Sequence, residues 1–180
     1  GSRKFGYGGY HYINNYWTNF AKKLIKKYNL NNTSSILDIG CGKAFLIFEI
    51  KKILPNIKVY GIDISKYALG CAPKLVKKNL FNLKAQDNLK KKWKKKQFDL
   101  VISMGCLHNL TINDLLTSFE NINYLSKKSY IMVESYRNVS ELFNLQCWAL
   151  TCESFFNQNE WIWIYEKFGY KGDYEFIYFE

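Results

Sequence analysis

The sequence predicts an α/β fold, with a mostly parallel sheet of six or seven strands and helices on both faces. Short apolar segments alternate with amphipathic segments of helical period between residues 36 and 134, as strands do with crossover helices. Two glycines one residue apart, Gly40 and Gly42, follow the first apolar segment, as where a backbone must pass close to a ligand. Aspartates stand at the ends of the first three expected strands, so we expect the ligand at the carboxyl edge of the sheet.

The composition predicts one cytoplasmic domain. A chain of 180 residues with 48% hydrophobic content is long enough for one packed core, and we expect a single domain over residues 3–180. Gly1 and Ser2 look like a tag-cleavage scar and are left aside. No apolar run reaches the ~18 residues of a membrane span, and no segment resembles a signal peptide. Five cysteines without a Cys-x-x-Cys pair favour reduced thiols, and no metal is expected.

The net charge of +11 comes largely from one segment of the chain. Six lysines lie within residues 90–96, and without them the formal charge is +5. A solvated face accounts for such a run, because the run contains a single aromatic residue and no arginine. A contact surface for nucleic acid is the alternative.

The expected elements follow one another in three stretches. Residues 3–28 form an arm and a helix laid over the core, with Asn14 or Asn15 as the helix cap. Residues 33–136 form the ligand-binding core. Its expected strands are 36–39, 58–62, 83–87, 98–104 and 129–134, and its expected helices are 43–54, 66–78 and 111–125. Thr111 with Asp114 caps the last of these helices. Residues 137–180 form an acceptor-side segment, in which 141–152 is ambiguous, 159–168 is helical and 176–179 is a final strand.

The glycine loop discriminates between nucleotide ligands. A dinucleotide site uses Gly-x-Gly-x-x-Gly, but Phe45 stands in place of the third glycine. A phosphate-binding P-loop is excluded, because no Gly-Lys-Ser/Thr follows at the required spacing. Asp38, which precedes the loop, would repel a pyrophosphate but suits a ligand that carries an ammonium group. S-adenosylmethionine is such a ligand.

Two further aspartates match the nucleoside part of S-adenosylmethionine. Asp63, at the end of the second expected strand, is placed to bind the ribose hydroxyls, and Asp87, at the end of the third, to accept from the adenine amine. Each aspartate alone can also be read as a helix cap. Three acids at the ends of consecutive strands favour one shared cleft.

Four segments carry a family resemblance: Ile36-Leu-Asp-Ile-Gly-Cys-Gly42, Val59-Tyr-Gly-Ile-Asp-Ile-Ser65, Ala85-Gln-Asp-Asn-Leu89 and Phe98-Asp-Leu-Val-Ile-Ser103. With them the sequence resembles the class I S-adenosylmethionine-dependent methyltransferases, which have a Rossmann-like fold. The resemblance implies that the methionine lies on Gly40, Cys41 and Gly42, the ribose and adenine on Asp63 and Ile64, and the adenine edge on Asp87 and Asn88. Asp38, Ser65 and Ser103 complete the expected cofactor-binding set.

The chain departs from the family pattern in two places. Ala44 stands where the first motif usually has its third glycine. The family normally ends with an antiparallel pair of strands, but only residues 176–179 form a clear strand here, and 144–152 is the candidate for the other.

The loop at residues 103–110 bears on the methyl acceptor. It lacks the Asn/Asp-Pro-Pro-aromatic signature by which some members hold a planar amino group. It also lacks the Pro-Cys pair of cytosine-C5 enzymes, because Gly105 precedes Cys106. Both absences argue against a nucleic-acid base as the acceptor. His108 stands where many small-molecule members carry a Leu-His pair and is the first candidate for the base, although it can also simply tie down the loop. His11 and Glu134 are further candidates, and transfer by alignment alone stays open.

We expect cationic and aromatic residues to line the acceptor-binding site. Arg137 is one of two arginines in a lysine-rich chain, which suggests a planar fork for a carboxylate or phosphate, with a surface salt bridge as the alternative. The expected acceptor-binding residues are Tyr7, Tyr10, His11, Tyr12, His108, Tyr136 and Arg137.

The segments at 134–138, 150–156 and 172–180 resemble a compact group of stand-alone bacterial methyltransferases associated with surface-polysaccharide genes. The resemblance implies O-methylation of a small anionic acceptor, namely a phosphorylated, nucleotide-linked or carboxylated metabolite such as a surface-glycan precursor. Two alternatives are an RNA methyltransferase that uses Lys90 to Lys96, and a module that binds S-adenosylmethionine without catalysis.

Overall fold

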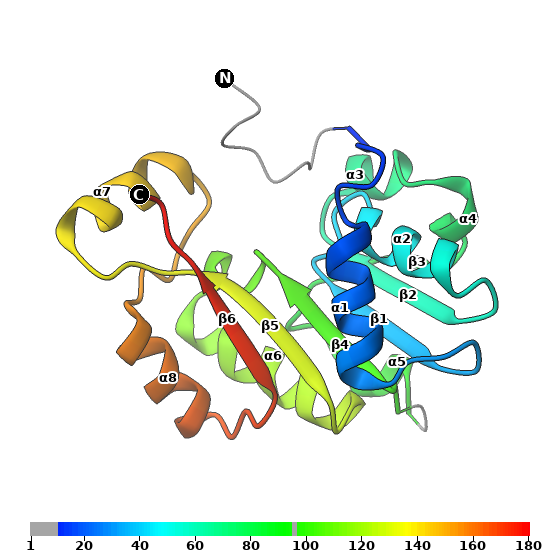
Figure 1. Ribbon diagram of the computed structural model, residues 1–180. Coiled ribbons are helices and arrows are strands. Elements are labelled where there is room, and N and C mark those ends of the chain that lie inside the picture. The colour runs from blue at the N-terminus through cyan, green and yellow to red at the C-terminus, as the bar shows by residue number, and fades with distance from the viewer. Residues whose placement is uncertain (1–10, 95–96) are drawn as a thin grey trace. The chain divides into compact units, whose positions relative to one another are not determined.

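The computed structural model describes residues 11–94 and 97–180. The chain divides into two compact units, residues 1–84 and 85–180, which we call the N-terminal and the C-terminal unit (Figure 1). Each unit is an α/β layer of three strands with its own helices. The prediction of one continuous domain stays a prediction.

The N-terminal unit is built on three parallel strands. Strand β1 (Ser35–Ile39) pairs with β2 (Lys58–Asp63), which pairs in turn with β3 (Leu80–Asn82). All five residues of β1 are buried, as expected of an apolar strand covered on both faces. The helices of this unit are α1 (Thr18–Tyr28), α2 (Phe45–Ile53), α3 (Lys66–Gly70) and α4 (Lys74–Lys77), and α1 packs against α2.

Three expectations for this unit were wrong. Helix α1 begins at Thr18 and not after an asparagine cap, because Asn15 adopts a left-handed conformation with φ 64° in the preceding turn. The helix expected at 66–78 is broken into α3 and α4, since Pro73 lacks the amide proton that a continuous helix needs. The strand expected at 83–87 lies earlier in the sequence, at 80–82 (β3), because α4 already ends at Lys77.

The C-terminal unit repeats the same architecture. Strand β4 (Leu100–Met104) pairs with β5 (Ser129–Glu134), and β5 pairs with β6 (Asp173–Ile177), all in parallel. Helix α6 (Ile112–Leu125) runs along one face of β4 and β5 and is capped by the Thr111 hydroxyl, as predicted (Figure 1). The remaining elements are α5 (Leu89–Lys92), a 3₁₀ turn (Leu107–Asn109), α7 (Val139–Trp148) and α8 (Gln158–Lys167).

The end of the chain differs from the expected antiparallel strand pair. The segment 144–152, the candidate for a strand, lies mostly in helix α7, which Asn138 caps by accepting from the Glu141 amide. Helix α8 follows, with a complete capping box of Asn157 and Glu160. Two helices between β5 and β6 make a crossover connection, so β6 enters the sheet parallel to β5.

The strands and helices confirm the predicted α/β class with a mostly parallel sheet. Over residues 11–94 and 97–180 the two units together hold six strands, and each pair within a unit is parallel. Among the described residues, no helix has the length and apolar content needed to span a membrane.

Candidate active site

The glycine loop is folded back onto the end of β2. The amides of Gly40 and Cys41 both donate to the Ile62 carbonyl, at 2.9 and 3.0 Å. Gly40 and Gly42 have φ of 76° and 53°, in the left-handed region that favours glycine. Ala44 also has a positive φ, 59°, at the start of α2, where the family's usual third glycine is absent. The loop therefore keeps the backbone path expected of the motif despite that substitution.

Asp63 connects the glycine loop to the helix that follows β2. Its carboxylate accepts from the Gly42 amide at 2.8 Å and from the Ser65 amide at 2.7 Å. The Ser65 hydroxyl in turn caps α3 by accepting from the Ala68 amide at 3.1 Å. Next to this carboxylate, the apolar side chain of Ile64 is 71% exposed.

Two residues that sequence reasoning missed hold this end of the N-terminal unit in place. Asn82, the last residue of β3, donates from its side-chain amide to the carbonyls of Asp63 and Ile64, at 3.0 and 2.8 Å. Gly61 in β2 leaves room for the loop, because a Cβ atom there would lie 2.7 Å from the Cys41 sulfur. The glycine in the middle of an otherwise apolar strand was the signal for this close approach.

Asp38 is buried within β1, with 4% of its surface exposed. Burial, together with the nearby negative charge of Asp63, raises the pKa of Asp38 from 3.8 to about 8. The side chain is therefore largely protonated at neutral pH in the folded protein.

This raised pKa predicts a pH-dependent stability. The unfolded chain releases the Asp38 proton above about pH 4, whereas the folded chain keeps it up to about pH 8, so this residue lowers stability as the pH rises through that window. The expected slope is about 1.4 kcal/mol per pH unit in the free energy of unfolding. We expect Asp38→Asn to remove this contribution, as measured by urea unfolding of both proteins at several pH values. Parallel curves for the two proteins would contradict the assignment.

The loop that carries Asp87 and Asn88 lies in the C-terminal unit. Asp87 is half-buried, and it does not directly follow a strand as expected, because β3 ends at Asn82. Asn88 is exposed and caps α5, where its side chain accepts from the Lys91 amide at 2.9 Å. The buried side chain of Asn121 in α6 donates to the carbonyls of Ala85 and Asp87, both at 2.8 Å. Asn121 thus fixes this loop, and its only signal in the sequence was a polar residue on the buried face of a helix.

His108 and Glu134 form a buried pair in the C-terminal unit. Nδ1 of His108 faces Oε2 of Glu134, the last residue of β5, and both atoms are sealed from solvent. The two side chains are 4% and 1% exposed. Because Nδ1 faces the Glu134 carboxylate, Nε2 is the ring nitrogen left to contact a ligand.

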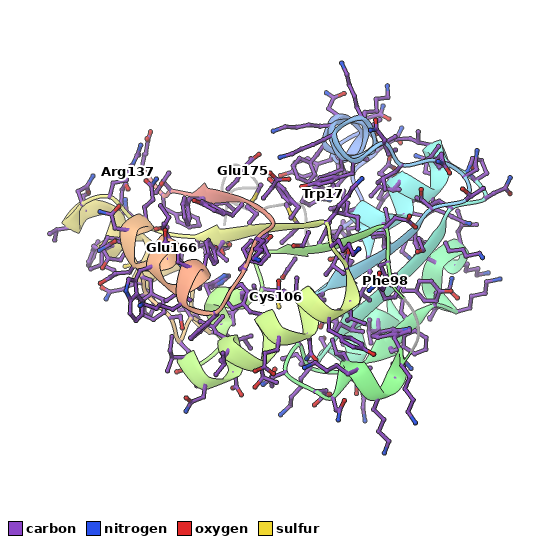
Figure 2. All side chains as sticks on the ribbon, turned by 90° about the horizontal axis from the view of Figure 1, so that it is seen from below. Trp17, Phe98, Cys106, Arg137, Glu166 and Glu175 are labelled. Atoms are coloured by element: carbon purple, nitrogen blue, oxygen red, sulfur yellow. The ribbon has the colours of Figure 1, made fainter. Side chains whose placement is uncertain are left out.

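The approach of the His108 loop to β5 depends on Gly105. Its φ is +59°, and a Cβ atom there would lie 3.2 Å from Oε1 of Glu134. Cys106, labelled in Figure 2, follows at the start of the 3₁₀ turn that carries His108. Ser103 is buried in β4, with 1% of its surface exposed. The structure thus brings together two of the three predicted catalytic candidates.

The third candidate, His11, lies in the N-terminal arm. It is exposed and lines a cavity of about 320 Å³ whose other walls are Tyr12, Lys43, Phe45, Phe48, Cys71 and Pro73. The Tyr12 hydroxyl is held by Glu49 in α2 and accepts from Lys52 at 2.9 Å, so this tyrosine anchors the arm to α2. Tyr7 and Tyr10, also predicted to bind the acceptor, lie outside the described residues.

Arg137 lies at the surface, where the chain leaves β5 (Figure 2). Its guanidinium donates to both oxygens of the Glu141 carboxylate and, at 2.6 Å, to Glu180, and it lies 4.3 Å from the centre of the Tyr178 ring. Glu141 is buried, whereas the side chain of Glu180 is 79% exposed. Tyr136, the neighbouring candidate, is half-buried, and burial raises the pKa of its hydroxyl.

Comparison with known proteins gives one family and several relatives. The sequence model of the family described as "Methyltransferase domain" matches residues 30–172. A ribosomal RNA small subunit methyltransferase C from Buchnera aphidicola is 37% identical over 95 residues, which are 52% of this chain and 28% of that protein.

Solved structures show the same fold. The plantazolicin methyltransferase BpumL in complex with S-adenosylhomocysteine has a TM-score of 0.56 and 24% identity, over 84% of this chain and 57% of its own. A putative methyltransferase from Haloferax volcanii, in complex with the activator Trm112, has a TM-score of 0.65 and 16% identity, over 86% of this chain and 68% of its own. The chain thus spans about a quarter of the curated relative and little more than half of BpumL.

Proposed function

Because the chain belongs to the methyltransferase-domain family, within the class I S-adenosylmethionine-dependent methyltransferases, we propose that it methylates an oxygen of a small anionic metabolite. Phosphorylated, nucleotide-linked or carboxylated surface-glycan precursors are the acceptors we propose. The observation that carries this proposal is the buried pair of His108 and Glu134, because only a hydroxyl or ammonium acceptor needs a base.

The described residues of the N-terminal unit fit S-adenosylmethionine. Two amides already orient the Asp63 carboxylate, which keeps lone pairs for the ribose hydroxyls. The exposed side chain of Ile64 offers an apolar surface for the adenine, and nothing lies within 4 Å of the position of a Cβ on Gly42. When bound, the cofactor supplies a methyl group on a positively charged sulfur.

His108 takes the role of general base in this proposal. Nε2 of His108 would take the proton that the acceptor hydroxyl loses when it is methylated. Glu134 holds the proton on Nδ1, so that Nε2 is the acceptor nitrogen, and its carboxylate stabilises the imidazolium that forms. A pair with these two roles is costly to bury without a function, which disfavours the module that only binds the cofactor.

Arg137 stays our candidate for the anionic group of the acceptor. Its bidentate contact with the buried Glu141 fixes the orientation of the guanidinium. The contact with the exposed Glu180 is the one that a substrate carboxylate or phosphate would replace. These same contacts also fit the alternative, in which Arg137 only forms a surface salt bridge. Identification of the methylated product distinguishes the two.

An RNA acceptor is the second candidate, because one relative is a ribosomal RNA methyltransferase and because residues 90–96 are rich in lysine. The exposed lysines of α5 precede the amino end of β4, whereas His108 follows its carboxyl end. The two ends of a five-residue strand are roughly 15 Å apart, so these lysines do not lie beside the proposed base. This arrangement favours the small acceptor.

The acceptor class can be measured without knowing the acceptor. The protein is incubated with methyl-labelled S-adenosylmethionine and, separately, with the RNA, protein and small-metabolite fractions of a cell extract. We expect the label in metabolites that bind an anion exchanger and none in the RNA. Label in the RNA fraction alone would overturn the small-acceptor proposal in favour of the second candidate.

A further inference from the structure

We propose that residues 151–156, here called the clamp segment, hold His108 in its working position, with Ser154 as the central positioning residue. The clamp segment joins α7 to α8 in the C-terminal unit. The inference rests on the proposed role of His108 as the base. It adds a set of residues, distant in sequence, on which that role depends.

The clamp segment binds the backbone of His108 directly. The His108 carbonyl oxygen accepts from two consecutive amides, those of Glu153 at 3.1 Å and Ser154 at 3.0 Å. The thiol of Cys152 lies 3.4 Å from the same oxygen. Three donors from adjacent residues therefore converge on one carbonyl, which leaves the peptide after His108 little freedom to rotate.

The next two residues of the loop are held by the same segment. The Ser154 hydroxyl donates to the Leu110 carbonyl at 2.6 Å, and the Thr151 hydroxyl donates to the Asn109 side chain at 2.7 Å. Ser154 is 2% exposed, so both its amide and its hydroxyl are committed to the loop away from water. Replacing Ser154 with alanine removes the hydroxyl and so leaves the Leu110 carbonyl without this donor, while the amide bond to His108 stays.

The far end of the clamp segment is fixed to the partner of His108. The hydroxyl of Ser135, which follows Glu134, donates to the Phe156 carbonyl at 3.1 Å. The indole of Trp161 donates to the Glu134 carbonyl at 3.3 Å and packs edge-on against Phe156. One short segment thus contacts the backbone of His108 and, through Phe156, the side chain of Ser135 next to Glu134.

The 3₁₀ turn that carries His108 needs such support. It is three residues long and has no side-chain cap, so its own hydrogen bonds do not fix its position. A base displaced by about 1 Å loses up to ~100-fold in rate. We infer that the clamp segment supplies the required precision and that Ser154 acts through the backbone, without touching the substrate.

The first test is spectroscopic and needs no acceptor. The chain has two histidines, so the imidazole signals in a ¹H–¹³C spectrum are those of His108 and His11. In Ser154→Ala we expect the His108 signal to shift or broaden, while the His11 signal stays as in the wild type. Ser118→Ala is the matched control, since that buried hydroxyl also donates to a carbonyl, Asp114, at 2.7 Å, but within α6.

The second test is the rate of methyl transfer to the small-metabolite fraction. We expect kcat to fall about tenfold in Ser154→Ala, with an unchanged affinity for S-adenosylhomocysteine, and to be unaffected in Ser118→Ala. If Ser154→Ala does not fold, Thr151→Val, at an exposed position, takes its place in both tests. For this variant we expect kcat to fall two- to threefold.

Failure of this inference differs from failure of the proposed function. A wild-type His108 signal and rate in Ser154→Ala, with His108→Gln inactive, would overturn the clamp alone. A fully active His108→Gln would overturn the base, and the spectrum of Ser154→Ala would still decide whether the clamp segment positions the ring.

Discussion

Replacing Asp63 with alanine is expected to lower the affinity for S-adenosylhomocysteine at least 100-fold. The carboxylate has two effects in the structure: it offers lone pairs to the ribose, and it holds the Gly42 and Ser65 amides at 2.8 and 2.7 Å. Hydrogen bonds to a charged group contribute about 1.5–3 kcal/mol each, and a loss of about 2.7 kcal/mol corresponds to a 100-fold change.

Calorimetric titration measures this change, and a second variant tests whether the carboxylate itself is needed and not only a side chain of its size. Asp63→Asn keeps the size of the side chain but presents an NH₂ group to one of the amides, so we expect a loss nearly as large. Asp114→Ala, at a half-buried position in the first turn of α6, is the matched control and should bind like the wild type. Equal affinities for Asp63→Ala and Asp114→Ala would rule out the ribose assignment.

His108→Gln is expected to lower kcat by about 10²–10⁴ while the affinity for S-adenosylhomocysteine stays within a factor of two. Loss of a positioned general base has an effect of this size. Because the contact with Glu134 is made through Nδ1, glutamine can keep part of this contact but cannot take up a proton. The measurement is the rate at which label from S-adenosylmethionine reaches the small-metabolite fraction.

His11→Gln distinguishes between the two histidines. His11 is exposed in the N-terminal arm, so we expect its replacement to change kcat less than threefold. A larger loss in His11→Gln than in His108→Gln would assign the base to the arm. Losses below twofold in both variants would favour methyl transfer by alignment alone.

The fold was predictable where one local pattern decides it. Strand β5 (Ser129–Glu134) was expected at the bounds it has, because an uninterrupted apolar run can only be a buried strand in this setting. The break near Pro73 follows from the proline itself, which lacks the amide proton that a continuous helix needs. The nature of residues 139–148 was not decided by pattern, because α7 has mixed polar and apolar faces that fit a helix or a strand.

The charged groups of the candidate site could be predicted from the sequence, but the residues that hold them in place could not. Asp63 and the glycines stand in a recognisable local order, whereas Asn121 acts on carbonyls at positions 85 and 87, more than thirty residues away. Such a role is set by tertiary contacts alone. Arg137 shows the opposite limit. Its rarity in the composition suggested a ligand, whereas in the structure it pairs with Glu141 in the first turn of α7.

The central claim is that the glycine loop and Asp63 bind S-adenosylmethionine, and calorimetric titration of the wild-type protein with S-adenosylhomocysteine tests it most directly. NAD, which also carries an adenosine but joins it through a pyrophosphate, is the control ligand. The account predicts saturable binding of S-adenosylhomocysteine with one molecule per chain and no heat from NAD. Binding of NAD in preference to S-adenosylhomocysteine, or of neither, would contradict it.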